Sequence, residues 1–107
     1  MPTLDLPSDC LRRVCEIVAK HAPDAEVWAY GSRVSGGAHA GSDLDLVVRQ
    51  PSRLAEPCGV IARLRGEFDE SNIPILVDVI DWARIPESFR RVIERGYVTL
   101  QQPALHT

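Results

Sequence analysis

The stretch that decides the fold is residues 26–49, EVWAYGSRVSGGAHAGSDLDLVVR. It opens with a short apolar run rich in aromatic residues, 26–30, which predicts a strand that ends at a glycine. Residues 31–42 hold four glycines and three serines, which predicts a loop with one short helix beginning at Ser32. Residues 44–49 (LDLVVR) predict a second strand, so the whole stretch is strand, glycine-rich loop and strand.

Asp43 and Asp45 lie two residues apart at the start of the second predicted strand, so both carboxylates project from one face. Leu44, Leu46 and Val48 then point to the opposite face, into the core. Two carboxylates this close repel each other, and a divalent cation between them relieves the repulsion. Because Mg²⁺ prefers one or two carboxylates together with substrate phosphates, the pair predicts a magnesium site.

Gly31 and Ser32 are candidates for a phosphate site. Gly31 allows a sharp turn off the strand and a close approach of phosphate, and the Ser32 hydroxyl and the N–H groups after it can donate to phosphate oxygens. Arg33 can also reach a phosphate, although an exposed salt bridge explains it nearly as well. Each short motif alone is common turn chemistry, but Gly-Ser-x10-Asp-x-Asp arises by chance in roughly one chain in a thousand of this length.

The flanking segments complete an α/β (α+β) pattern, with a small mixed β-sheet flanked by helices. The third strand is nearly continuous in hydrophobicity, which predicts burial on both of its faces. At 107 residues, we expect a single domain over 1–107. We expect helices over 8–22, 53–69 and 86–95, the third strand over 74–80 and a short edge strand over 97–100.

Asp78 interrupts the third predicted strand, PILVDVI. A buried acid there costs several kcal/mol to desolvate unless it is paired or bound to metal. The alternative is a structural ion pair, for example with an arginine of the last helix. Asp81 is more easily explained as a loop residue that caps the segment after it. The sequence therefore favours Asp78 as a third metal ligand and leaves Asp81 open.

Composition limits the classes of function. The net charge of −3, from 12 basic and 15 acidic residues, argues against a general nucleic-acid binder but not against a nucleotide site. Cys10, Cys15 and Cys58 lack the C-x-x-C spacing of zinc sites, so we expect them to be packing residues. The chain shows no signal-peptide pattern and no apolar run near the length of a membrane span, which predicts a cytoplasmic protein without a membrane partner.

The string GSRVSGGAHAGSDLDLVV resembles the Gly-Ser-x10-Asp-x-Asp signature of the DNA polymerase β-like nucleotidyltransferase superfamily. The length resembles that of its minimal branch, the MNT domain proteins of prokaryotes. The resemblance covers residues 9–100, and Asp78 within ILVDVID matches the third carboxylate of the family. It implies the nucleotidyltransferase fold and a transfer of AMP, or another nucleotide, from an NTP to an acceptor hydroxyl.

The resemblance also implies cofactors and a partner. Asp43, Asp45 and Asp78 would hold two Mg²⁺ ions, with ATP as substrate, and Gly31 and Ser32 would hold its outer phosphates. Proteins of this branch are typically antitoxins encoded beside a HEPN-domain ribonuclease toxin, and several are thought to transfer AMP to a tyrosine of that toxin. The resemblance therefore predicts a hetero-oligomer.

Two hypotheses about function remain at this point. One is an active nucleotidyltransferase that modifies its protein partner. The other is a non-catalytic, nucleotide-binding antitoxin that neutralises the partner by covering it. Larger relatives carry a helical second domain that grips the base and the acceptor, and we expect the partner to supply that wall here. Antibiotic nucleotidylation is less favoured, because such a domain would be needed to enclose a small acceptor.

Overall fold

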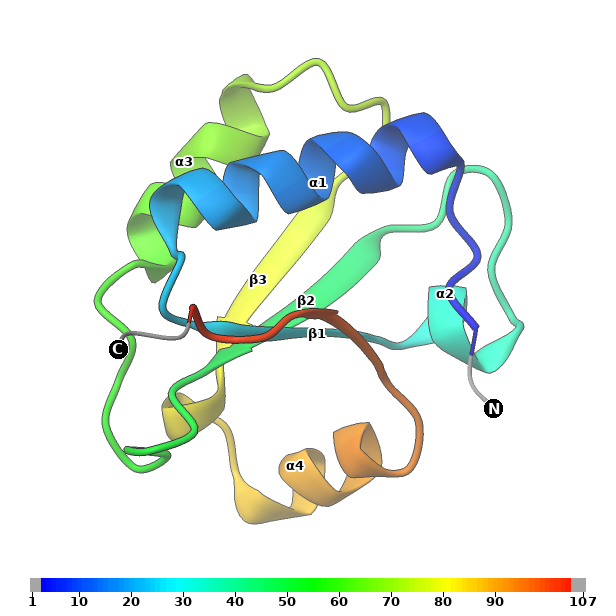
Figure 1. Ribbon diagram of the computed structural model, residues 1–107. Helices are drawn as coiled ribbons and strands as arrows, with labels where there is room; N and C mark the ends of the chain where they lie inside the picture. The colour runs from blue at the N-terminus through cyan, green and yellow to red at the C-terminus, as the bar shows by residue number, and fades with distance from the viewer. Residues whose placement is uncertain (1–2, 105–107) are drawn as a thin grey trace.

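The computed structural model describes residues 3–104 and shows a four-stranded sheet with helices on both faces (Figure 1). The predicted α+β class with a small mixed sheet is confirmed. The elements along the chain are α1 (Ser8–His21), β1 (Glu26–Tyr30), α2 (Ser32–Ser35), β2 (Leu44–Arg49), α3 (Ile61–Glu70), β3 (Val77–Asp81), the 3-10 turn η1 (Trp82–Arg84), α4 (Glu87–Glu94) and β4 (Val98–Gln101).

The strands lie in the order β3-β2-β1-β4. β1 is antiparallel to both of its neighbours, β2 and β4, whereas β2 and β3 are parallel and are connected through α3. A parallel connection needs such a crossover, because the chain must return to the same end of the sheet. β1 and β2 are therefore the central strands, and their sequences are the stretch from which the fold was predicted.

Apolar side chains alternate along the strands and build a core on each face of the sheet. α1 and α3 cover one face, above the sheet in Figure 1, and α4 covers part of the other face below it. The helix-covered upper core contains Val14 and Val18 of α1 and Leu64 of α3, all at most 1% exposed. Val14 and Val18 are four residues apart, so they lie on the same side of α1.

The predicted helix over 53–69 begins later than expected, at Ile61. Residues 50–60 form turns instead, with Arg53 N donating to Gln50 O and Glu56 N donating to Arg53 O. The backbone N–H of Cys58 donates to the Asp81 carboxylate across the fold. This tertiary hydrogen bond holds the segment as a loop, so the predicted start of the helix at residue 53 is wrong.

The third strand is shorter than predicted and is not buried on both faces. It lies at the edge of the sheet and includes only Val77–Asp81, of which Val79 and Asp81 are buried. Leu76, just before it, is 69% exposed. The apolar run does not reveal this because hydrophobicity along a strand does not report which neighbours the fold places beside it.

Truncation of a core residue tests this packing. Leu64→Ala truncates a fully buried side chain of α3. We therefore expect it to lower the free energy of unfolding by about 2–5 kcal/mol in urea denaturation. Val92→Ala is the control on the exposed side of α4, 55% exposed, and we expect a change within about 0.5 kcal/mol. Equal losses for the two variants would contradict this assignment of the core.

Candidate active site

Three polar side chains lie side by side across three strands. Tyr30 of β1 pairs in register with Asp45 of β2, and Asp45 pairs with Asp78 of β3. Residues paired across strands project from the same face of a sheet. Tyr30, Asp45 and Asp78, which we call the acidic row, therefore lie on the face that α4 covers in part. Asp43 precedes β2 and is exposed at the same end.

Gly31 lies directly against this row. It has φ 81° and ψ −154°, a conformation that L side chains rarely adopt. A Cβ atom at Gly31 would collide with Oδ2 of Asp45 and would lie 3.4 Å from its Cγ. Glycine is therefore required here for two reasons, the backbone conformation and the approach of the carboxylate, which agrees with the sharp turn expected from the sequence.

Ser32 begins the short helix α2 directly after Gly31. The backbone N–H groups of Val34 and Ser35 both donate to Gly31 O at 3.0 Å, and Gly36 ends the helix in the left-handed conformation. The side chain of Ser32 is half-buried at the end of the sheet where Asp45 also lies. The structure thus places Gly31 against Asp45 and Ser32 directly after it, and phosphate binding by this pair stays a prediction.

Negative charge accumulates in the row. Burial raises the pKa of Asp45, and the neighbouring carboxylates Asp78 and then Asp43 raise that pKa further. The three carboxylates predicted from the sequence therefore interact with one another electrostatically. Such a group gains stability from any cation that it binds.

The structure distinguishes Asp78 from Asp81. Asp81 pairs with Val48, which points to the opposite face from Asp45, and it is 4% exposed. Its carboxylate accepts hydrogen bonds from the N–H groups of Cys58 (2.9 Å) and Ala83 (3.1 Å). Asp81 thus caps η1, as expected of a capping residue, and is separated from the acidic row by the sheet itself.

Asp78, in contrast, is exposed rather than buried. The prediction that desolvation makes it an unusual acid is wrong, because β3 is an edge strand and this part of its face is open. Among the residues described, no arginine forms an ion pair with it. What distinguishes Asp78 is its position beside Asp45.

Arg33 has a different environment from the one predicted. Its guanidinium is buried, the residue being 4% exposed, and it donates to the carbonyl oxygens of Asp5 (2.8 Å), Ala40 (3.2 Å) and Ser42 (2.9 and 3.0 Å). The suggested exposed salt bridge is therefore wrong. Arg33 holds the loop that ends at Asp43, and direct contact with a phosphate stays a prediction.

Tyr30 is the residue of this site that the sequence patterns do not single out. Its signal is positional: it directly precedes Gly31 and lies on the same strand face as Trp28. On its own, an aromatic residue at the end of an apolar strand predicts only core packing. The cross-strand register is needed to show that it borders the carboxylates.

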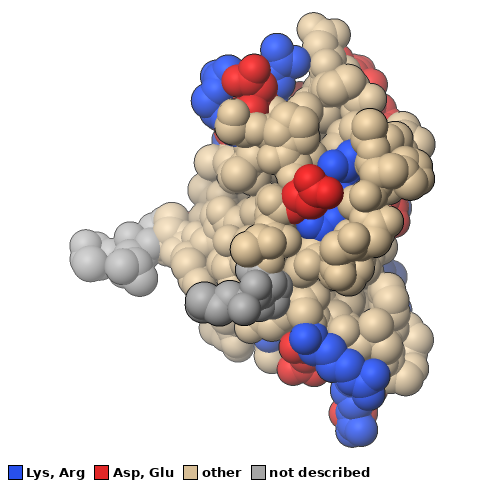
Figure 2. All heavy atoms as spheres, turned by 90° about the vertical axis from the view of Figure 1, so that its right-hand side faces the viewer, with Lys and Arg blue, Asp and Glu red and all other residues tan. Residues whose placement is uncertain are grey.

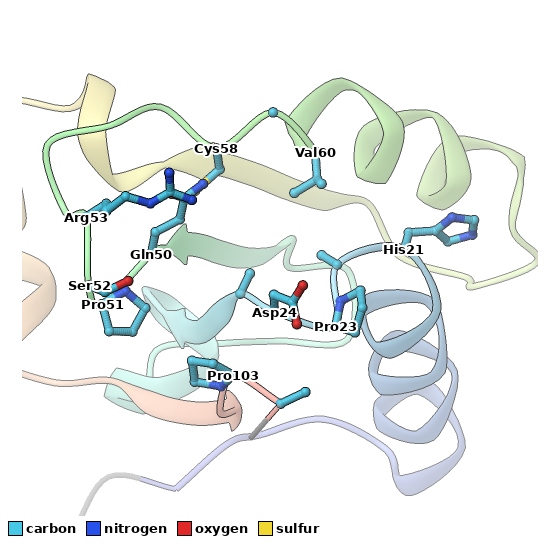
Figure 3. Close-up of a pocket in the computed structure, with 14 residues that line it drawn as sticks. His21, Pro23, Asp24, Gln50, Pro51, Ser52, Arg53, Cys58, Val60 and Pro103 are labelled. Carbon is cyan, nitrogen blue, oxygen red and sulfur yellow. The ribbon is translucent and has the colours of Figure 1, made fainter. Parts of the chain in front are cut away.

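One hollow among the described residues lies at the other end of the sheet. It has a volume of ≈ 740 Å³ and is lined by the end of α1, the loop after β2 and residues 103–104 (Figure 3). Its one acid is Asp24. The predicted carboxylates, Gly31 and Ser32 are all absent from this lining.

The described atoms of the face that includes α2, on the right of Figure 1, are mostly uncharged in Figure 2. Where acidic and basic side chains occur on it, they lie next to one another. Over residues 3–104, no three His, Cys, Asp or Glu side chains lie close enough to enclose a metal ion by themselves. The predicted three-carboxylate metal site thus stays a prediction.

Within the described part of the chain, no helix has both the length and the apolar character needed to cross a membrane.

The chain has a Gly-Ser turn beside carboxylates from adjacent strands of a small mixed sheet. This arrangement is typical of nucleotidyltransferases. The family model of the nucleotidyltransferase domain matches residues 11–101. The chain belongs to this family, in its MNT type, and is a nucleotidyltransferase enzyme. The resemblance inferred from the motif is confirmed.

Two known proteins are similar to the chain. It is 43% identical over 101 residues to the "Probable protein adenylyltransferase MntA" of Haemophilus influenzae (strain ATCC 51907 / DSM 11121 / KW20 / Rd), covering 92% of this chain and 85% of that protein. A solved structure described as "Crystal structure of the toxin-antitoxin with AMP-PNP" has a TM-score of 0.68 and 17% identity, covering 86% of this chain and 73% of that one. The second similarity confirms the fold.

Exchanging glycine for alanine at two positions tests the contact between Gly31 and Asp45. Gly31→Ala places a Cβ against the carboxylate at an unfavourable φ, so we expect a loss of about 1–3 kcal/mol in the free energy of unfolding. Gly66→Ala in α3 meets nothing within 4 Å and should instead stabilise the protein by about 0.5–1 kcal/mol. Urea denaturation compares the two, and a neutral Gly31→Ala would refute the contact.

The charge in the row predicts a pH dependence of stability. The pKa of Asp45 is higher in the folded state than its ordinary value of 3.8. The ionised carboxylate therefore destabilises the fold at pH values above 3.8, and this effect disappears as the pH falls below 3.8. With EDTA present, we expect Asp45→Asn to be more resistant to urea than wild type at pH 7. The difference should vanish at pH 3, whereas the control Asp69→Asn, exposed on α3, should show no such gain.

Proposed function

We propose that this protein is a magnesium-dependent adenylyltransferase that transfers AMP from ATP to a hydroxyl of a protein partner. The observation that carries the proposal is the side-by-side pairing of Asp45 and Asp78, with Gly31 against the Asp45 carboxylate. The printed name of the H. influenzae relative, a probable protein adenylyltransferase, supports AMP as the transferred group and a protein as the acceptor.

The donor set fits magnesium. Asp43, Asp45 and Asp78 offer hard carboxylate oxygens, and burial together with the charges of Asp78 and Asp43 raises the pKa of Asp45. Mg²⁺ commonly binds one or two carboxylates and completes its coordination with substrate phosphates and water. An open row, rather than an enclosed cage, is the arrangement that suits two ions bound together with ATP.

The chain's own residues would position the reactants. Gly31, which has no side chain, would let a phosphate approach the backbone next to Asp45, and the Ser32 hydroxyl would donate to the outer phosphate oxygens. When bound, Mg²⁺ neutralises phosphate charge and stabilises the charge that develops on pyrophosphate. Asp78, at the exposed edge of the row, is nearest to an acceptor that arrives from outside the sheet.

The reaction exchanges one phosphorus–oxygen bond for another. The acceptor oxygen attacks the α-phosphorus of ATP, the bond from that phosphorus to the bridging oxygen breaks, and pyrophosphate leaves. Asp78 takes the proton from the acceptor hydroxyl and passes it to solvent. The solvent exposure of Asp78 supports this assignment, because a buried carboxylate would have no such route.

The partner is a HEPN-domain toxin, and the chain acts as its antitoxin within a hetero-oligomer. The toxin–antitoxin description of the structural neighbour supports a complex of this kind. The openness of the acidic row supports it as well, since the second wall of the site must come from another molecule. The cysteines among the described residues are all free, which supports a reducing, cytoplasmic setting.

Transfer of labelled AMP tests the proposed function. The chain is incubated with α-labelled ATP, Mg²⁺ and the HEPN-domain protein encoded beside it, and label should appear on that protein. Asp45→Asn and Asp78→Asn should each lower the initial rate at least about a hundredfold, as expected when a group that stabilises the transition state is removed. Asp69→Asn on α3 is the matched control and should keep the wild-type rate.

Two results would overturn the proposal. One is that the wild-type protein leaves its partner unlabelled, or labels it equally well when EDTA removes the Mg²⁺. The other is that a variant carrying both Asp43→Ala and Asp45→Ala still protects cells from the toxin as well as wild type does. The second result would show that the chain neutralises its partner by binding alone.

A further inference from the structure

Tyr30 carries a polar atom that the fold leaves without a partner. The residue is 8% exposed, yet its hydroxyl makes no hydrogen bond with any of the residues described. The oxygen is not among the unpartnered atoms that are sealed from solvent, which are Trp28 Nε1, Arg49 Nε and Gln50 Oε1. The ring is therefore buried while the hydroxyl emerges at the surface.

Packing fixes the position of the Tyr30 ring. The ring meets Phe89 of α4 edge-on, with the centroids 5.8 Å apart and the planes at 83°. On the sheet side, register with Asp45 holds Tyr30 in the acidic row. Tyr30 therefore lies on the face, and at the end of the sheet, where Asp45, Asp78 and Gly31 also lie.

The charge around Tyr30 keeps it a donor. Burial raises the pKa of Tyr30 well above its ordinary value of 10.0, and the negative charges of Asp45 and Asp78 raise it further. The phenol therefore stays protonated at physiological pH. An anionic ligand beside the phenol can therefore accept a charge-assisted hydrogen bond from it.

We propose, on the basis of the proposed function, that the Tyr30 hydroxyl is a nucleotide ligand that donates a hydrogen bond to a phosphate oxygen of ATP bound at the acidic row. Gly31 lies against the Asp45 carboxylate, and Tyr30 pairs in register with the same residue. Tyr30 and Ser32 thus flank Gly31 in the sequence and approach the triphosphate from two sides.

Removing one oxygen atom tests the proposal. Tyr30→Phe keeps the ring against Phe89, and binding of Mg²⁺·AMP-PNP is measured by calorimetry. We expect the affinity to fall about tenfold, as for a lost hydrogen bond to a charged group. The melting temperature of the ligand-free protein should stay close to that of wild type, because the hydroxyl makes no hydrogen bond with the described residues. If Tyr30 had only a structural role, Tyr30→Phe would not lower the affinity for AMP-PNP while leaving the melting temperature unchanged.

Tyr97→Phe is the matched control. The chain has two tyrosines, and Tyr97 stacks on Trp28 at 3.8 Å between centroids, in the part of the face that α4 closes. Its substitution makes the same chemical change and should leave the affinity for AMP-PNP unchanged. If wild type binds AMP-PNP and Tyr30→Phe binds it equally well, this inference fails and the proposed function stands. If wild type binds none, both fail.

A spectroscopic readout on the wild-type protein decides the matter even if the variant does not fold. The ¹³Cζ resonance of a tyrosine responds to a hydrogen bond made by its hydroxyl, so Mg²⁺·AMP-PNP should shift the signal of Tyr30 and leave that of Tyr97 in place. An unmoved Tyr30 signal at saturation overturns the proposal. So does a mass increase of one AMP on Tyr30 after incubation with ATP, because the phenol would then be an acceptor.

Discussion

The repulsion among carboxylates on one sheet face is the constraint on which the site depends. The antiparallel pairing of β1 with β2 and the parallel pairing of β2 with β3 bring Tyr30, Asp45 and Asp78 into one row. Crowded negative charge destabilises a ligand-free fold. The same strands offset that cost on their other face, where Leu44 and Leu46 are at most 1% exposed beneath α1 and α3.

The face that carries the row is divided between a closed half and an open half. In the closed half, the guanidinium of Arg49 lies 4.0 Å from the ring centroid of Trp28 and 4.5 Å from that of Trp82, and it pairs with Glu26 at 3.0 Å. These contacts and α4 seal that part of the sheet. The open half holds the acidic row, in which Asp45 is half-buried and Asp78 is exposed.

The errors in the sequence-based expectations have a common physical origin. The apolar residues of 53–69 satisfy a helical period, but the hydrogen bond from Cys58 N–H to Asp81 holds the first part of this segment as a loop. The apolar run ending at Ile80 predicts a doubly buried strand, but the sheet order places it at an edge. Both outcomes depend on neighbours far along the chain, which local periodicity cannot report.

The sequence by itself determined the local parts of this protein: the strand, glycine-rich loop and strand of 26–49, and the family. These depend on the two-residue period of a strand and the turn chemistry of glycine, which act over a few residues. Only the tertiary structure decided that Asp78 rather than Asp81 borders Asp45, that Arg33 is buried in its own loop and that Tyr30 faces the carboxylates. The reason is that strand register sets these relations, and register comes from pairing between distant segments.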